Sequence, residues 1–416
     1  MEKEYIVTLK QGVDPTAFRQ DMIADNMLPY VPPKAVTVAN ERPASIRNTH
    51  YMLTDVEADV LQYDERVEAV ELRPDLRDDI GIERFATQTG NFDKSTATSG
   101  DNINWGLRRM SALANPYNSS GAVVGGYDHT LTGTGVDFIV QDSGIQADHP
   151  EFQDSFGNSR VQEIDWYQAQ SVVSGTLPAG FYTDYDGHGT HVAGIAAGKT
   201  YGWAKNSKIY SIKIAGLQGS QDPNNGMSIS DIFDVVKEWH KAKTPDVLTG
   251  VKRPTVINMS WGYFSRYFSI TGGNYRGTPW TGNSKLTAYG MTGAFDGSGY
   301  RHPIRVASVD ADVDELIEAG VVVCIAAGNN YHKIATASDP DYNNYYTNSF
   351  GQTKYYHRGS SPYSTNAIMV GNIDSALDSG GKEQIAQSSE KGPGVDVYAP
   401  GTNIFSSTST TNRFTD

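Results

Sequence analysis

Apolar and polar residues alternate in short stretches over residues 1–78, and this pattern predicts a small α+β domain. Strands are expected at residues 4–9, 49–53 and 67–72. Helices are expected to begin after Asp14 and after Thr54, because both side chains are good helix caps. The resulting order of strand, helix, strand, helix and strand is that of a ferredoxin-like module.

Residues 79–101 are expected to be a linker: Ile80 to Phe85 are still mixed, but residues 87–100 are small and polar, which is the composition of a linker. Beyond them the pattern changes to nearly continuous apolar runs, as expected for strands that are buried on both faces of a parallel sheet. Such runs occupy residues 136–140, 208–214, 255–259 and 321–325. Helical periodicity follows them, for example in Ile232, Val235, Val236 and Trp239. Residues 102–416 are therefore predicted to form a three-layer α/β domain on a mostly parallel sheet.

The composition excludes some classes of function. The 416 residues carry a net charge of −14, which argues against nucleic acid and anionic membranes as partners. No run approaches the ~18 apolar residues of a membrane helix. The single cysteine, Cys324, lies in an apolar run and is expected to be a buried, inert thiol. The first residues show no apolar signal region, so we expect a cytoplasmic protein or one carried within a particle such as a virion.

Three polar residues stand where catalytic groups of α/β proteins gather, near the ends of predicted strands. Asp142 closes the first apolar run, and a turn aspartate is the alternative interpretation. Asn329 follows the last run, where it could instead be a capping residue. His188 stands between Gly187 and Gly189 at the start of a small-residue helix, and the alternative is a structural histidine. An asparagine side chain is also a suitable donor to the oxyanion of an acyl-transfer reaction.

The segments around these residues resemble the motifs of the subtilisin-like serine proteases, or subtilases. The matching strings are Asp186-Gly187-His188-Gly189-Thr190-His191-Val192-Ala193-Gly194, Asp142-Ser143-Gly144 and Ala326-Ala327-Gly328-Asn329. The resemblance implies peptide-bond hydrolysis, with His188 as general base, Asp142 orienting it and Asn329 binding the oxyanion. It also implies protein or peptide substrates, no required cofactor and no catalytic metal. The substrate-binding residues that it implies are Ser260, Trp261, Gly262, Gly226, Met227, Ser228, Ala327 and Gly328.

Residues 1–78 are in turn similar to the propeptide, or inhibitor domain, of subtilases. The alternative is an unrelated ferredoxin-like module. The resemblance implies that this domain packs on helices of the protease-like domain as its own partner. The linker at 79–101 would then run toward the substrate cleft near Trp261 and contain a self-cleavage site. Structural Ca²⁺ is compatible with the family, and the Asp- and Asn-rich residues 339–363 are either a Ca²⁺ loop or a solvated one.

Two departures from the family pattern leave the function open. Residues 263–310 are a long insert, rich in Gly, Tyr, Phe and Thr, that could redirect substrates or contact assembly partners. The nucleophilic serine of the family lies in a Gly-Thr-Ser motif after the Ala-Pro-Gly strand, and these 416 residues contain no Gly-Thr-Ser. One hypothesis is that the chain is the front part of a subtilase zymogen whose catalytic serine follows residue 416. The other is an inactive subtilase-like structural or interaction module, for example of a virion.

Overall fold

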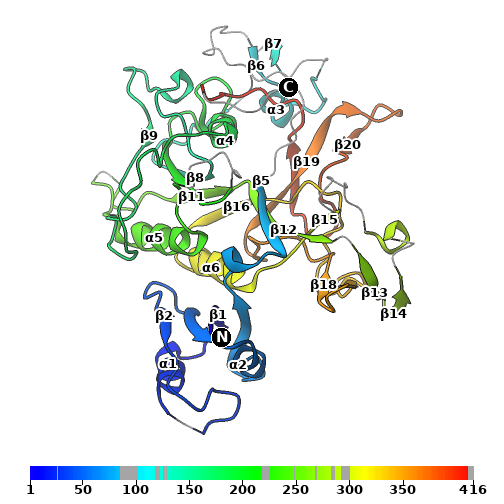
Figure 1. The fold of residues 1–416 in the computed structure, drawn as a ribbon. Coiled ribbons are helices and arrows are strands. Elements are labelled where there is room, and N and C mark those ends of the chain that lie inside the picture. The colour runs from blue at the N-terminus through cyan, green and yellow to red at the C-terminus, as the bar shows by residue number, and fades with distance from the viewer. Residues whose placement is uncertain are drawn as a thin grey trace.

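The computed structural model describes most of the chain, and Figure 1 shows its architecture. The described residues are 1–25, 27–84, 102–117, 122–124, 127, 129–217, 225–247, 249–267, 269–282, 286–291 and 300–410. Most of the predicted linker, residues 85–101, therefore lies outside the description. No helix among these described ranges is long and apolar enough to cross a membrane.

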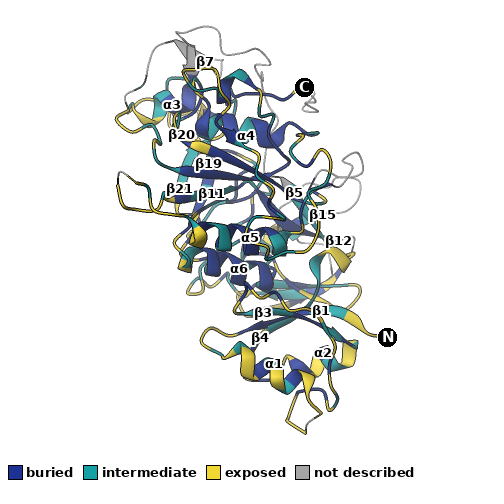
Figure 2. Ribbon diagram, turned by 90° about the vertical axis from the view of Figure 1, so that its left-hand side faces the viewer, coloured by how far each residue is buried: buried dark blue, intermediate teal, exposed yellow. Residues whose placement is uncertain are grey.

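The N-terminal domain is a four-stranded antiparallel sheet with two helices on one face, so the predicted α+β arrangement is confirmed. Its strands are β1 (Lys3–Leu9), β2 (Val38–Asn40), β3 (Asn48–Leu53) and β4 (Val67–Leu72), and its helices are α1 (Pro15–Ile23) and α2 (Asp55–Leu61). Asp14 caps α1, and Thr54 forms a capping box with Glu57 at the start of α2. Figure 2 shows α1 and α2 on the outer side of the sheet, whose other side faces the rest of the molecule.

The second domain is built on an eight-stranded, mostly parallel sheet, as predicted; we call it the central sheet. Its order is β20-β19-β16-β11-β8-β10-β9, with β21 also paired to β19, and only β20 runs antiparallel. The strands are β8 (Asp137–Asp142), β9 (Val161–Gln162), β10 (Lys208–Lys213), β11 (Thr255–Met259), β16 (Val322–Ala326), β19 (Ile368–Leu377), β20 (Glu383–Ile385) and β21 (Val397–Pro400). Parallel neighbours place the carboxyl ends of β8, β11 and β16 at one edge of the sheet.

Helices cover the two faces of the central sheet unequally. Helices α5 (Ile229–Ala242) and α6 (Ala307–Glu318) pack on one face and lie between the sheet and the N-terminal domain (Figure 2). Helix α4 (His188–Ala197) packs on the other face, against β8 and β10. Farther along that second face, side chains of β16, β19 and β21 stay exposed. Val322 is 44% exposed, Ile368 42% and Val397 44%. We call this part the bare face.

The insert and the Tyr- and Asn-rich segment come together in a small accessory lobe, which the sequence patterns did not predict. Strands β13 (Ile270–Tyr275), β14 (Thr278–Thr281), β17 (Tyr345–Asn348) and β18 (Thr353–Tyr355) form its sheet, around an aromatic cluster that includes Trp280 and Tyr346. Two stretches of residues 339–363, Tyr345–Asn348 and Thr353–Tyr355, are therefore strands of a packed sheet. Asp339 and Asp341 of the same segment form ion pairs with Lys333, and Asp341 also with Arg276.

A separate three-stranded sheet joins the lobe to the N-terminal domain. Its central strand is β12 (Trp261–Tyr267), with β15 (Tyr300–Pro303) on one side and β5 (Ile80–Arg84) on the other. Residues 80–84, which their position assigned to the linker, thus form a strand because β12 offers an unpaired edge. The remaining helix α3 (Trp105–Met110) and the hairpin of β6 (Asn102–Asn104) and β7 (Ala122–Val124) lie beside the last described residues (Figure 1).

Candidate active site

Asp142 and His188 form a buried pair between the sheet and helix α4. Asp142 is the last residue of β8, and His188 is the first residue of α4. His188 Nδ1 lies 2.7 Å from Asp142 Oδ1, and the two residues are only 2% and 0% exposed. The hydrogen bond expected between them is thus present. A carboxylate at Nδ1 fixes the tautomer, with Nε2 as the ring nitrogen that can take up a proton.

Two further residues hold His188 in place, and sequence reasoning missed both. Asp184 is buried, and its carboxylate accepts hydrogen bonds from Ser143 Oγ, from the backbone N–H of Gly187 and from both the N–H and the hydroxyl of Thr190. Ser143 Oγ in turn accepts the N–H of Gly189 at 2.8 Å. Their signal was position alone: Asp184 lies four residues before His188, and Ser143 follows Asp142.

Two glycines explain the local backbone. Gly187 caps α4 with φ of +96°, a conformation that other residues rarely adopt. A side chain at Gly189 would bring its Cβ to 2.1 Å from the carbonyl oxygen of Gly144. The close approach of the two segments therefore requires glycine at that position, and this approach brings Asp142 and His188 together.

The loop after β16 places Asn329 beside the same groove. Gly328 has φ of +120°, and Ala327 donates its N–H to Val370 O. A fully buried carboxyl group supports this loop: Glu390 Oε1 accepts the N–H of Asn330. Burial raises the pKa of Glu390 well above its usual value, and the nearby Glu83 carboxylate adds to the effect. Glu390 was not identified from the sequence, since its motif neighbours lie sixty residues away.

A groove of about 290 Å³ lies at the carboxyl ends of the strands of the central sheet. His188 and Asn329 both line it, and so do Val192, Ile195, Ala196, Cys324, Ala326, Ala327, Gly328 and Val370. The groove continues the bare face toward α4. Cys324 also lines the groove and is only partly buried. The expectation of a buried thiol is therefore wrong. Partial burial raises the pKa of this thiol.

The sequence-predicted substrate residues fall into two groups. Ser260, Ala327 and Gly328 line the groove, and Trp261 and Gly262 open strand β12, where they pair with Arg84 and Glu83. The other group does not line the groove, although Met227 pairs with Ile214, whose N–H donates to the carbonyl of Asp142. Its members are Gly226, Met227 and Ser228.

The contacts of this second group are those of packing and capping. Met227 is fully buried and exchanges backbone hydrogen bonds with Lys213 and Ala215. Ser228 caps α5. A Cβ at Gly226 would meet the backbone of Ile214 at 2.4 Å. The adjoining residues 218–224 lie outside the description.

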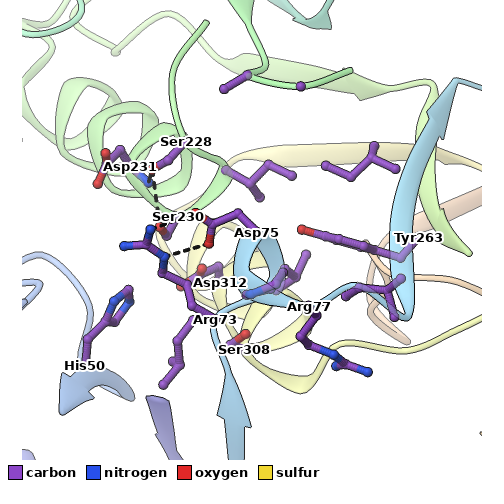
Figure 3. Close-up of a pocket in the computed structure, with 18 of the residues that line it drawn as sticks. His50, Arg73, Asp75, Arg77, Ser228, Ser230, Asp231, Tyr263, Ser308 and Asp312 are labelled. Atoms are coloured by element: carbon purple, nitrogen blue, oxygen red, sulfur yellow. Dashed lines mark hydrogen bonds and ion pairs between the residues drawn. The ribbon is translucent and has the colours of Figure 1, made fainter. Parts of the chain in front are cut away.

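A second hollow, shown in Figure 3, lies between the N-terminal domain, β5 and the start of α5. Its volume is about 470 Å³. The Arg73 guanidinium crosses it and pairs with Asp75, while the Tyr263 hydroxyl points inward from β12. His188 and Asn329 do not line this cavity, so it is distinct from the groove.

Comparison with known proteins gives the family. The family model described as "Subtilase family" (peptidase S8) matches residues 133–416, about two thirds of the chain. The chain belongs to the subtilase family. Among curated relatives of this subtilase, the Saccharomyces cerevisiae subtilase-type proteinase RRT12 is 29% identical over 279 residues, covering 67% of this chain and 38% of the relative. A cuticle-degrading serine protease of Arthrobotrys oligospora is 28% identical over 313 residues, covering 75% and 53%. This chain therefore spans about half or less of the relatives it matches.

Solved structures are similar at low identity. The epidermin leader peptide processing serine protease of Staphylococcus aureus is 14% identical with a TM-score of 0.46, over 96% of this chain and 75% of that one. A cold-adapted subtilisin-like serine proteinase is 22% identical with a TM-score of 0.42, over 76% and 77%. Within the described part of the chain, no three or more His, Cys, Asp or Glu side chains are grouped to hold a metal ion.

Proposed function

We propose that this subtilase is the front portion of a serine endopeptidase zymogen that hydrolyses peptide bonds by acyl transfer. His188 is the general base, Asp142 orients it and stabilises its charged form, and Asn329 donates to the oxyanion. The observation that carries the proposal is the buried 2.7 Å contact between His188 and Asp142 beside the groove that Asn329 also lines.

The nucleophile is proposed to be a serine that opens a helix seated in the groove. An apolar helix face would cover the partly exposed residues of the bare face, and the groove runs along α4 to His188. Ser406 and Ser407 also touch α4, but their hydroxyls donate to the carbonyls of His191 and Thr190, as structural residues do. We propose that this helix belongs to a part of the natural protein beyond these 416 residues.

The N-terminal domain is proposed to be a built-in inhibitor. Strand β5 adds to the edge of β12 at Trp261 and Gly262, where an extended peptide substrate would pair. The domain itself sits on α5 and α6: Glu71 accepts the N–H of Ser308 at the start of α6. Glu315 accepts the backbone N–H groups of Ile46 and Arg47. Substrate would enter only after β5 has left.

Labelling of the natural full-length protein with a fluorophosphonate tests the proposal. We expect covalent labelling of one serine after the inhibitor domain is removed. His188→Ala should abolish labelling, whereas His129→Ala, a change at an exposed histidine, should not. Asp142→Asn should reduce turnover by roughly 10⁴-fold.

The alternative is a non-catalytic interaction module. The observation in its favour is the accessory lobe, which gives this chain a second sheet beside the protease-like one. A full-length protein that carries no reactive serine and binds a partner through this lobe would replace the enzyme proposal.

A further inference from the structure

Strand β12 has two partners, and they come from different parts of the chain. On one edge it pairs with β5 from Ile80 to Arg84, and on the other with β15 from the insert (Figure 1). If β5 occupies the place of a substrate, as proposed above, side chains of the insert lie within reach of that substrate. The contacts of β5 then show which peptide the site accepts.

Glu83 is held by the insert and by the loop of Asn329. It pairs with Gly262, which has no side chain, so the Glu83 carboxylate can extend past β12. Glu83 Oε2 accepts Arg301 Nη1 at 2.9 Å, and Oε1 accepts Asn330 Nδ2 at 2.9 Å. The Glu83 side chain is 14% exposed. A neutral or basic residue there would leave the Arg301 charge without this partner, which selects for an acidic side chain.

Gly81 lies against an aromatic ring of the insert. A Cβ at Gly81 would come to 2.9 Å from Phe264 Cζ and 3.1 Å from Cε1. The freedom of the ring to move is reduced, because Phe264 is buried and the guanidinium groups of Arg301 and Arg266 lie over the ring at 4.7 and 5.0 Å from its centroid. This position therefore selects for glycine.

The residue before the strand, Asp79, contacts Lys354 of strand β18 in the accessory lobe. Asp79 receives hydrogen bonds from Lys354 Nζ and from Arg77. Burial alone would raise the pKa of Asp79, but these two cations hold it below its usual value. Between these polar positions, Ile80 and Ile82 pack against the main core.

We propose that Phe264, Arg301 and Lys354 are specificity-determining residues, and that the substrates are extended peptides of the pattern acidic, apolar, glycine, apolar, acidic. Residues 79–83 (Asp-Ile-Gly-Ile-Glu) are the built-in example of that pattern. The inference rests on the proposed protease function for its substrate, but the three contacts with residues 79–83 stand without it. Two experiments therefore separate the two ideas.

The first experiment needs no catalysis. Amide hydrogen exchange is measured at residues 80–84 in the 416-residue chain. Gly81→Ala and Arg301→Ala should each raise exchange there about tenfold or more. Gly81→Ala in a Phe264→Ala background should cost much less, because the ring is gone; Phe264→Leu serves if the alanine variant does not fold. Arg276→Ala, with the same change in charge but paired to Asp341, is the control and should leave β5 unchanged. Equal exchange in wild type, Gly81→Ala and Arg301→Ala would overturn the inference.

The second experiment uses the full-length enzyme after removal of the inhibitor domain. Cleavage of a peptide containing Asp-Ile-Gly-Ile-Glu is compared with peptides in which Gly is replaced by Ala or Glu by Gln or Lys. We expect kcat/KM to fall about tenfold or more for each. Arg301→Glu should reverse the order of the Glu and Lys peptides, and Phe264→Leu should narrow the difference between Gly and Ala. An enzyme that cleaves all these peptides equally would overturn the inference. A protein that cleaves none of the peptides and is not labelled by fluorophosphonate would overturn the proposed function. The exchange measurements would still decide whether the contacts of Phe264 and Arg301 stabilise β5.

Discussion

Arg42 of the N-terminal domain lies between Asp234 of α5 and Asp312 of α6. Its Nη2 donates to Asp234 Oδ1 at 3.0 Å and to Asp312 Oδ1 at 2.9 Å, and all three side chains are less than 5% exposed. Removing one partner of a buried pair leaves uncompensated charge. We therefore expect Arg42→Ala to destabilise the docked state by ~3–5 kcal/mol. Urea unfolding and limited proteolysis of the 416-residue chain measure this loss.

The effect of Arg42→Ala should depend on pH. Burial, with help from the Asp234 and Glu315 carboxylates, raises the pKa of Asp312 to about 7 although Arg42 opposes it. The folded state then binds more protons than the unfolded one, whose aspartate pKa is about 3.9, so this contribution weakens as pH rises from there toward 7. The free energy of unfolding that Arg42→Ala removes, relative to wild type, should therefore be small near pH 4 and large at pH 7. Lys3→Ala, which breaks an exposed pair with Asp55, is the control and should cost less than ~1 kcal/mol. An equally small loss for Arg42→Ala at pH 7 would contradict this account.

Cys324 reports whether the groove is occupied. It is the only cysteine, so a thiol reagent such as a maleimide labels one site, and it lines the groove, where it is partly exposed. We expect the folded 416-residue chain to be labelled, more slowly than in denaturant because partial burial raises the thiol pKa. A full-length protein with the proposed serine helix in place should be protected by at least an order of magnitude. Equal labelling of the two folded proteins would show that no helix covers the groove.

The sequence predicted those parts of the fold that depend on local pattern. Strands β8 and β16 appear as continuous apolar runs, although only β8 is buried on both faces and β16 is partly exposed on the bare face. Asp142 ends β8, His188 opens α4 and Asn329 follows β16 closely. Short sequence motifs at these boundaries were therefore enough to identify all three residues.

The accessory lobe was not predicted, because its strands pair over long distances in sequence. Residues 270–275 pair with residues 345–348, and neither segment alternates clearly between apolar and polar side chains. Strand β5 was missed for the same reason, since it is a strand only because β12 lies beside it. Glu390 and Asp184 were missed because their roles come from the segments against which they fold.

Asp184 should be needed to position His188. Its carboxylate accepts hydrogen bonds from the hydroxyls of Ser143 and Thr190 and from backbone N–H groups, and an amide could not accept all of them. In the full-length enzyme we expect Asp184→Asn to lower kcat by ~10²-fold with KM little changed, since the substrate-pairing edge is untouched. The exposed Asp148→Asn is the matched control and should retain activity. A rise in KM without loss of kcat would instead place Asp184 in substrate binding.

Glu390 should make stability fall as pH rises. It is fully buried beneath the loop of Asn329, and burial together with Glu83 raises its pKa well above the ordinary value. The folded protein then holds a proton that the unfolded chain releases near pH 4.3, so each pH unit above that value costs up to ~1.4 kcal/mol until the folded-state pKa is reached. Glu390→Gln keeps an oxygen that can accept the Asn330 N–H but cannot ionise. We therefore expect urea unfolding between pH 4.5 and 8 to show a shallower decline for Glu390→Gln than for wild type, while the exposed Glu68→Gln follows wild type. Parallel curves for wild type and Glu390→Gln would mean that Glu390 is already ionised in the folded protein, and that the Asn329 loop tolerates a buried negative charge.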